Sequence, residues 1–171
     1  MLDRVIGVFK LSSNTFEEIE HDQNATGEAA IVVAVVALLA AIGSGIGATA
    51  IGNRGFFGGF ISTLIWVFVA WIVWSAVTFF VGTAIFGGKA DMGEMLRVTG
   101  YAFAPQLLGI IPCIGWIIGL IWTLAALFVA ARQGLDLDNT KTALTVVVGL
   151  IVYLIGAAIL SLLIGGIGAL F

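Results

Sequence analysis

Few side chains in this sequence could take part in chemistry, and their spacing does not bring them together. His21 is the only histidine and Cys113 is the only cysteine, so the chain can supply neither the usual ligands of a zinc site nor an internal disulfide. The long apolar runs hold no Asp, Glu, Lys or His away from their ends. Ionisable groups at such positions mark proton relays and ion paths. We therefore expect neither an ion-coupled pump nor an enzyme, and no bound metal or cofactor.

Two short motifs look chemical but fit structural roles better. Residues 136–140, DLDNT, are like the aspartate-nucleophile loop of haloacid-dehalogenase phosphatases, but that loop follows a β-strand and this one joins two apolar runs. We interpret it as a helix cap. Residues 43–47, GSGIG, lie inside an apolar run, which excludes a phosphate-binding loop. Gly43 and Gly47 have the small-xxx-small spacing that lets membrane helices approach closely. We expect both to face another helix, either in this chain or in a second copy.

Several polar and aromatic side chains remain inside the apolar runs. Gln106 follows Pro105, and its amide could bond the carbonyl that this proline leaves free, a neighbouring helix or a substrate. Tyr101 is expected to give its hydroxyl to a neighbouring helix. Trp71 and Trp74 are three residues apart and share one face of a predicted helix. They either pack within the helix bundle or offer a flat surface to a partner helix, a sterol-like lipid or a pigment.

The elements that would position these residues are membrane helices. The 171-residue chain is 61% hydrophobic and 10% charged, with a mean hydropathy of +1.17, whereas a soluble domain is about 25% charged. Residues 1–27 hold several acids and no apolar core of a secretory signal, so we expect an amphipathic N-terminal segment inside the cell. Residues 28–171 are expected to form one all-α transmembrane domain. Its predicted spans are residues 28–51, 58–84, 92–111, 113–132 and 142–170.

The uncharged stretch between Arg97 and Arg132 holds 34 residues and two prolines. A single helix of that length would reach about 51 Å, against a hydrocarbon core about 30 Å thick. Two helices fit if the chain turns at Pro112. Asp91, with a glutamate three residues later, predicts a capping box at the start of the first helix. Pro105 is expected to bend that helix without ending it.

The basic residues choose between four and five crossings. With the N-terminus inside and five crossings, six of the seven Lys and Arg residues fall on the inner side and Arg54 alone falls outside, as the positive-inside rule requires. Four crossings would divide them four against three. We therefore predict five transmembrane helices, an inner loop at residues 134–139 and an outer C-terminus. Arg97 lies within the third helix, and its side chain is expected to reach back to the interface.

The N-terminal segment carries its own helical pattern. Leu2, Val5, Ile6 and Phe9 form one apolar stripe. This helix either lies flat on the inner membrane surface or packs under the bundle. The acid-rich stretch at residues 12–22 predicts a second short helix.

The order of these parts resembles the YIP1 family of membrane proteins. The resemblance rests on residues 4–7 (RVIG), residues 15–19 (TFEEI) and above all residues 97–105, which contain Gly100, Tyr101 and Pro105. It covers nearly the whole chain and implies a multi-pass helical fold. Eukaryotic members of the family work in vesicle traffic, bind Rab-type GTPases and carry a DLYGP-type element before the first helix. Residues 12–28 contain no such element, so the chain looks like a prokaryotic-type member and we expect no Rab-type GTPase partner.

These patterns predict a non-catalytic, multi-pass protein of the cell (cytoplasmic) membrane that acts as a scaffold, a membrane organiser or an accessory subunit of a membrane complex. Its expected partners are the lipid bilayer and either another membrane protein or a second copy of itself, and not nucleic acid. The alternative is a small permease or channel. Gln106 and the hydroxyl side chains of the second span support that alternative, whereas the lack of a charged ring opposes it.

Overall fold

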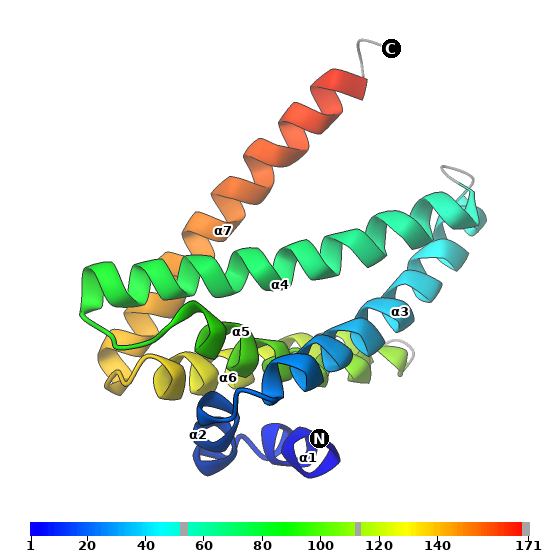
Figure 1. Cartoon of the computed structure of the whole chain (residues 1–171). Coiled ribbons are helices and arrows are strands. Elements are labelled where there is room, and N and C mark those ends of the chain that lie inside the picture. The colour runs from blue at the N-terminus through cyan, green and yellow to red at the C-terminus, as the bar shows by residue number, and fades with distance from the viewer. Residues whose placement is uncertain (52–54, 112–113, 169–171) are drawn as a thin grey trace.

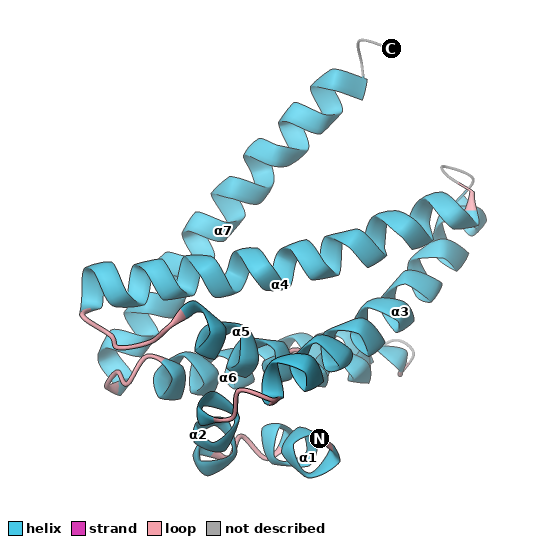
Figure 2. Cartoon of the chain, viewed as in Figure 1, coloured by secondary structure: helices cyan, strands magenta, loops and turns pink. Residues whose placement is uncertain are grey.

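In the part of the chain that the structure describes, helices joined by short loops are the regular secondary structure, and no strand is present in those residues (Figure 1 and Figure 2). The computed structural model describes residues 1–51, 55–111 and 114–168. The elements in chain order are α1 (Leu2–Phe9), α2 (Ser13–His21), α3 (Ala25–Ile51), α4 (Phe56–Phe86), α5 (Met92–Ala102), the 3-10 helix η1 (Ala104–Ile110), α6 (Gly115–Gly134) and α7 (Asn139–Gly168). The predicted all-α membrane fold is confirmed.

Four of the described helices, α3, α4, α6 and α7, are long and apolar enough to cross a membrane. Their bounds lie within three residues of four predicted spans. Each is an apolar run without an internal proline or charge pair, and in lipid such a run must pair its backbone groups within its own helix. Local sequence is therefore enough to place these four elements.

The predicted span at residues 92–111 is not one helix. α5 ends at Ala102, and η1 begins two residues later. The expectation that Pro105 only bends this helix is therefore wrong. Pro105 has no N–H, and in an α-helix its ring would collide with the carbonyl of Tyr101; at the start of η1 that N–H is not needed. α5 and η1 rise about 16 Å and about 14 Å, so neither is long enough to cross a core about 30 Å thick by itself, and the count of five crossings is approximate.

The helical hairpin of the third and fourth spans is present. No continuous helix connects Arg97 to Arg132, because η1 ends at Ile110 and α6 begins at Gly115. Gly115 lies against the carbonyl of Leu108, and a Cβ on Gly119 would lie 3.1 Å from the carbonyl oxygen of Pro105. These glycines let α6 return along η1 in direct contact. The predicted turn residue Pro112 lies outside the described residues.

Three polar segments lie on one side of the bundle. The backbone N–H of Lys89, after α4, donates to the carbonyl of Leu135, after α6, at 2.9 Å. The side-chain amide of Gln133 donates to the carbonyl of Ser13 in α2 at 3.5 Å. The loop after α4, the loop after α6 and the N-terminal segment therefore share a side, which is the arrangement that the basic residues predict.

The N-terminal helix α1 is amphipathic, but its apolar stripe is divided between two environments. Of the stripe, Val5 and Phe9 are partly buried against the core, whereas Leu2 is 71% exposed and Ile6 is 52% exposed; Val8, outside the stripe, is fully buried. Gly7 allows α1 to pack closely against α2, because it lies against the side chain of Thr15, where a Cβ would collide. One face of α1 thus packs against the remainder of the protein and the opposite apolar edge stays uncovered.

The tightest packing lies where α2, α5 and α6 meet at this polar side. The fully buried side chains there include those of Phe16, Ile19, Met95, Val98 and Leu135. Outside the bilayer, burial of such side chains is driven by the hydrophobic effect, at about 25 cal/mol for each Å² removed from water. α1 and α2 therefore belong to the same packed core as α5, and they do not form a separate tail.

Candidate functional site

An ion-pair network built around Arg4 joins α1, α2 and α3. The guanidinium donates to Glu18 at 2.9 Å from Nε, to Asp22 at 2.7 Å from Nη2 and to Glu28 at 3.1 Å from Nη1. The hydrogen bond to Asp22 raises the pKa of Arg4 above its ordinary value, and the same bond lowers the pKa of Asp22. One charged side chain thus holds three helices at the polar side of the bundle.

Tyr101 connects this network to α5. Its side chain is fully buried, and its hydroxyl donates to the carboxylate of Glu28, which also accepts from Arg4. The expectation that Tyr101 bonds a neighbouring helix matches this contact. Gly100, the preceding residue, allows α5 to approach, because a Cβ there would lie 2.9 Å from Ala29 and 3.1 Å from the indole nitrogen of Trp71. The Gly-Tyr pair therefore fixes α5 between α3 and α4.

Arg97 makes a second polar link from α5, to α2. It is only 7% exposed, and it donates to the backbone carbonyl of Glu20 at 3.0 Å from Nε and 2.7 Å from Nη2. Glu20 lies in the last turn of α2, where unpaired carbonyls carry the negative end of the helix dipole. The side chain reaches the polar side as expected, but it ends in a protein contact and not in the lipid headgroups.

The carboxyl group of Glu20 is itself in an unusual position. Burial raises its pKa to about 7, and the nearby carboxylates of Asp136, Glu94 and Glu17 act in the same direction, whereas the charge of His21 opposes them. These acids come from α2, α5 and the segment after α6. The charge of this junction therefore changes near neutral pH.

His21 is exposed and interacts within its own helix. Its Nδ1 lies 2.8 Å from the carbonyl oxygen of Glu17 in its own helix. Among the described residues, no group of three or more His, Cys, Asp or Glu side chains could hold a metal ion. The DLDNT segment acts as a cap: the carboxylate of Asp138 accepts from the N–H groups of Thr140 and Lys141 at 2.9 Å and 3.0 Å.

The tryptophans of α4 lie inside the bundle. Trp71 and Trp74 are buried, and Trp71 donates from its indole nitrogen to the carbonyl of Leu96 at 3.1 Å. The ring of Trp74 packs edge-on against that of Tyr153 in α7, with centroids 5.8 Å apart. Of the two predicted roles, the structure contains bundle packing, and an open aromatic surface at Trp71 and Trp74 is not present.

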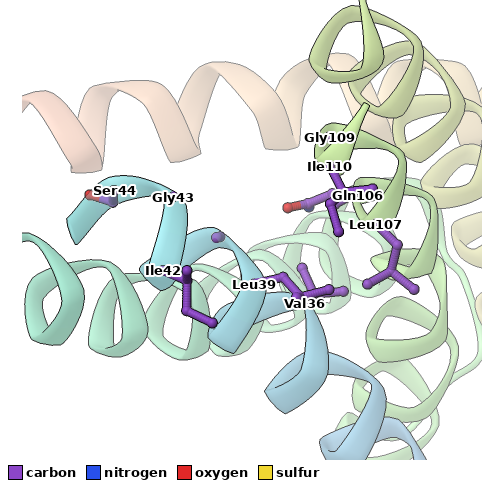
Figure 3. Close-up of a pocket in the computed structure, with 10 residues that line it drawn as sticks. Val36, Leu39, Ile42, Gly43, Ser44, Gln106, Leu107, Gly109 and Ile110 are labelled. Carbon is purple, nitrogen blue, oxygen red and sulfur yellow. The ribbon is translucent and has the colours of Figure 1, made fainter. Parts of the chain in front are cut away.

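Gln106 lies in η1 at the edge of an apolar groove. The groove has a volume of about 480 Å³ and is lined by α3 from Val36 to Ser44 and by η1 from Gln106 to Ile110. Figure 3 shows the side chain of Gln106 directed into the space between the two helices. The amide makes no hydrogen bond within the described residues, so the predicted bond to a freed carbonyl is absent.

A second cavity, of about 280 Å³, lies between α4, η1, α6 and α7. Its lining is mostly apolar and includes four aromatic side chains, those of Trp66, Trp74, Phe103 and Tyr153. Two of the lining residues also carry a buried polar atom. The indole nitrogen of Trp74 and the hydroxyl of Thr123 are buried and have no hydrogen-bond partner. Buried polar atoms without partners are uncommon and need a physical explanation.

Within the described residues, the close glycine contact between α3 and another helix does not involve Gly43 or Gly47. A Cβ on either would meet no described atom within 4 Å, and contact of these two glycines with a second copy stays a prediction. Gly45 and Gly59 bring α3 and α4 together, because a Cβ on either would lie 2.8 Å from the opposite helix. The spacing rule identified the right helix, but it could not identify the face turned toward α4.

The sequence alone did not indicate that Arg4, Glu20 and Glu28 take part in a polar network. Arg4 entered only as an inner charge and as part of the RVIG element, and Glu28 only as the beginning of a span. A usable signal was present, because a carboxylate in the first turn of an apolar run needs a partner when other helices cover it. The identity of that partner depended on the packing of α5 against α3.

Long apolar helices joined on one side by a polar network define a multi-pass helical membrane protein. The family model described as the Yip1 domain matches residues 6–166. The chain therefore belongs to the Yip1 family, and the resemblance carried by residues 97–105 is confirmed. Comparisons with curated proteins and with solved structures found no match.

Proposed function

We propose that this protein is a non-catalytic scaffold or accessory subunit of the cell membrane that binds another membrane helix through α7. The observation that carries the proposal is the exposure of α7. Only 17% of its 18-residue apolar stretch is buried, against 33–39% in the other three long helices. Figure 1 shows α7 leaving the other helices toward its C-terminal end. A helix that contacts few neighbours in its own chain is free to pack against a partner.

The ionisable groups support a structural role. Arg4, Glu28 and Arg97 are engaged in bonds that hold helices together, and none of them faces a cavity deep in the bundle. The Yip1 family is a family of non-enzymatic membrane proteins. Two acids of the N-terminal segment, Glu18 and Asp22, pair with Arg4, which leaves them poorly placed to recruit a Rab-type GTPase.

A photo-crosslinking amino acid placed on α7 tests the proposal. Ile151 and Leu154 are exposed, and Phe80 on α4 is an equally exposed control. In native membranes we expect a protein adduct of one discrete size from α7 and only lipid adducts from Phe80. An adduct twice the mass of the chain identifies self-association, and any other discrete mass identifies a partner subunit. Lipid adducts alone at both α7 positions refute the proposal.

The alternative of a small permease draws on one observation. The side-chain amide of Gln106 makes no hydrogen bond within the described residues, and Gln106 lines both cavities. Purified protein in liposomes decides between the two functions: solute flux above background that Gln106→Leu abolishes would replace the scaffold with a permease. We expect no such flux, because the cavity linings are mostly apolar and carry no charged side chain.

A further inference from the structure

The ion-pair network around Arg4 locates the inner boundary of the hydrocarbon core at the end of α5. Glu28, in the first turn of α3, pairs with the N-terminal ammonium of Met1 at 3.5 Å and with Arg4 at 3.1 Å. Such charges are strongly disfavoured inside the core, so they lie at its inner boundary. Tyr101 bonds the same carboxylate, and only one residue of α5 follows it. The first arm of the hairpin made by η1 and α6 therefore enters the core near Phe103.

The second arm of this hairpin returns to the boundary at Trp122 of α6. The indole nitrogen donates to the carbonyl of Phe9, at the end of α1, at 2.8 Å, and the next residue, Lys10, is exposed and charged. Tryptophan favours the membrane–water interface. Burial also changes at Trp122, because 6 of the 8 residues from Gly115 to Trp122 are exposed, against 2 of the 12 that follow to Gly134. The lipid-exposed part of α6 therefore ends at Trp122.

The two arms are too short to cross the bilayer. η1 has seven residues and rises about 14 Å, and the part of α6 from Gly115 to Trp122 rises about 12 Å. Each rise is less than half of a hydrocarbon core about 30 Å thick. By comparison, the 27 residues of α3 rise about 40 Å. The described residues at the tip of the hairpin, Ile110, Ile111 and Ile114, therefore lie near mid-depth.

The side chains at the tip suit lipid tails and not the outer surface of the membrane. Ile110 is 71% exposed and Ile114 is 56% exposed, and residues 107–118 contain no charged, amide or hydroxyl side chain. The sequence between α3 and α4, which the basic residues place outside, instead contains Asn53 and Arg54. A tip in water would expose a continuous apolar surface, whereas in the bilayer the same side chains contact acyl tails.

The backbone beside the tip is also suited to lipid, where N–H groups must find partners within the protein. The N–H of Ile111 donates to the carbonyl of Leu108 at 3.0 Å, and the N–H of Gly115 donates across the turn to the carbonyl of Ile111 at 3.1 Å. Both N–H groups are thus paired without water, so these backbone groups can lie inside the hydrocarbon core.

We propose that the arms at residues 103–111 and 114–122 form a re-entrant hairpin, which enters the inner leaflet and returns without crossing the bilayer. The acyl tails of inner-leaflet lipids cover the exposed apolar side chains of its tip, and α3, α4 and α7 make the complete crossings. Three crossings and five crossings place the loops and the C-terminus on the same sides, so the basic residues do not distinguish these topologies. This inference is independent of the partner surface on α7.

The depth of the tip tests the proposal in the full-length chain. Nitroxide labels are attached to Ile110→Cys and Ile114→Cys in lipid nanodiscs, with Cys113→Ser to remove the native thiol. Both labelled side chains are exposed, so the label displaces no packed contact. Collisions with oxygen and with a water-soluble nickel chelate measure depth, since oxygen concentrates in lipid tails. Leu38→Cys, in the middle of α3, and Phe57→Cys, at the start of α4, give reference depths for the midplane and the outer surface.

We expect both tip labels to show the high oxygen-to-nickel collision ratio of the Leu38 label, and neither cysteine to react with an impermeant thiol reagent outside intact cells. A ratio closer to that of the Phe57 label overturns the proposal, as does reaction from outside at the rate of Gly55→Cys. Each variant must keep the thermal transition of the unaltered protein. If one does not, Trp116→Cys replaces it, because Trp116 is 63% exposed beside the tip, and the same two outcomes decide.

Discussion

Replacement of Arg97 by methionine tests whether α5 holds the N-terminal segment in place. Arg97 is buried and both of its bonds end on the carbonyl oxygen of Glu20. Methionine has a similar length and no donor, so Arg97→Met leaves that carbonyl buried and short of a partner. The substitution leaves the start of α5 intact, because the capping box of α5 ends at Glu94, three residues before Arg97.

The expected loss follows from these contacts. A hydrogen bond to a charged group contributes about 1.5–3 kcal/mol, and a cation at a helix C-terminus adds about 0.3–1 kcal/mol. Removal of a buried charge returns part of its desolvation cost. We expect a net destabilisation of about 2–4 kcal/mol, which corresponds to a fall in Tm of roughly 5–15 °C for a chain of this size.

The assay compares thermal unfolding in mild detergent with limited proteolysis of the N-terminal segment. Arg132→Met is the matched control, because Arg132 is exposed and forms no ion pair within the described residues. Arg97→Met should lower Tm and speed tryptic cleavage after Lys10, which is exposed but held in the folded N-terminal segment, while Arg132→Met should do neither. If the two variants unfold at the same temperature and are cleaved at the same rate, Arg97 does not hold α2 and the reasoning is wrong.

Three further outcomes follow from the fold. A cysteine at Lys141 should resist an impermeant thiol reagent outside intact cells, while one at Gly55 reacts, because the loops after α4 and α6 share the inner side. The pKa of Glu20 is raised to about 7, so the free energy of unfolding should fall by about 1–2 kcal/mol, after screening, as pH rises from about 4.5 to about 7. Glu20→Gln should flatten this pH dependence in thermal melts at pH 5 and pH 8. An unchanged pH dependence in the variant contradicts the raised pKa of Glu20. Gly59→Leu should lower Tm, since a Cβ at this position lies 2.8 Å from a backbone oxygen of α3. Gly43→Leu places its side chain in open space, so it should leave Tm unchanged and alter only self-association, measured as the mass of the protein particle in detergent.

The sequence determined the parts of this protein that depend on neighbours within one helix. Apolar runs of 20 residues or more can satisfy their backbone groups in lipid only as helices, so α3, α4, α6 and α7 were predictable to within a few residues. The capping box of Asp91 and Glu94 is also local, and both of its hydrogen bonds are present at 2.6 Å and 2.7 Å. The membrane class and the Yip1 family follow from the same local information.

The tertiary structure decided which faces meet, and it thereby decided the candidate site. Arg97 bonds a carbonyl 77 positions away, and Tyr101 bonds a carboxylate 73 positions away. No periodicity predicts such pairs, because a helical pattern can show which face is covered but not which residue of a distant helix covers it. The long helices, which are apolar on all sides, do not show even the covered face. The same ambiguity is why the spacing rule pointed to Gly43 and Gly47, whereas Gly45 is the glycine of α3 that packs against α4. It also left open whether the tryptophans of α4 face lipid or the bundle. Pro105 ended a helix that length alone suggested would continue, since its ring and the carbonyl of Tyr101 cannot occupy the same space in an α-helix.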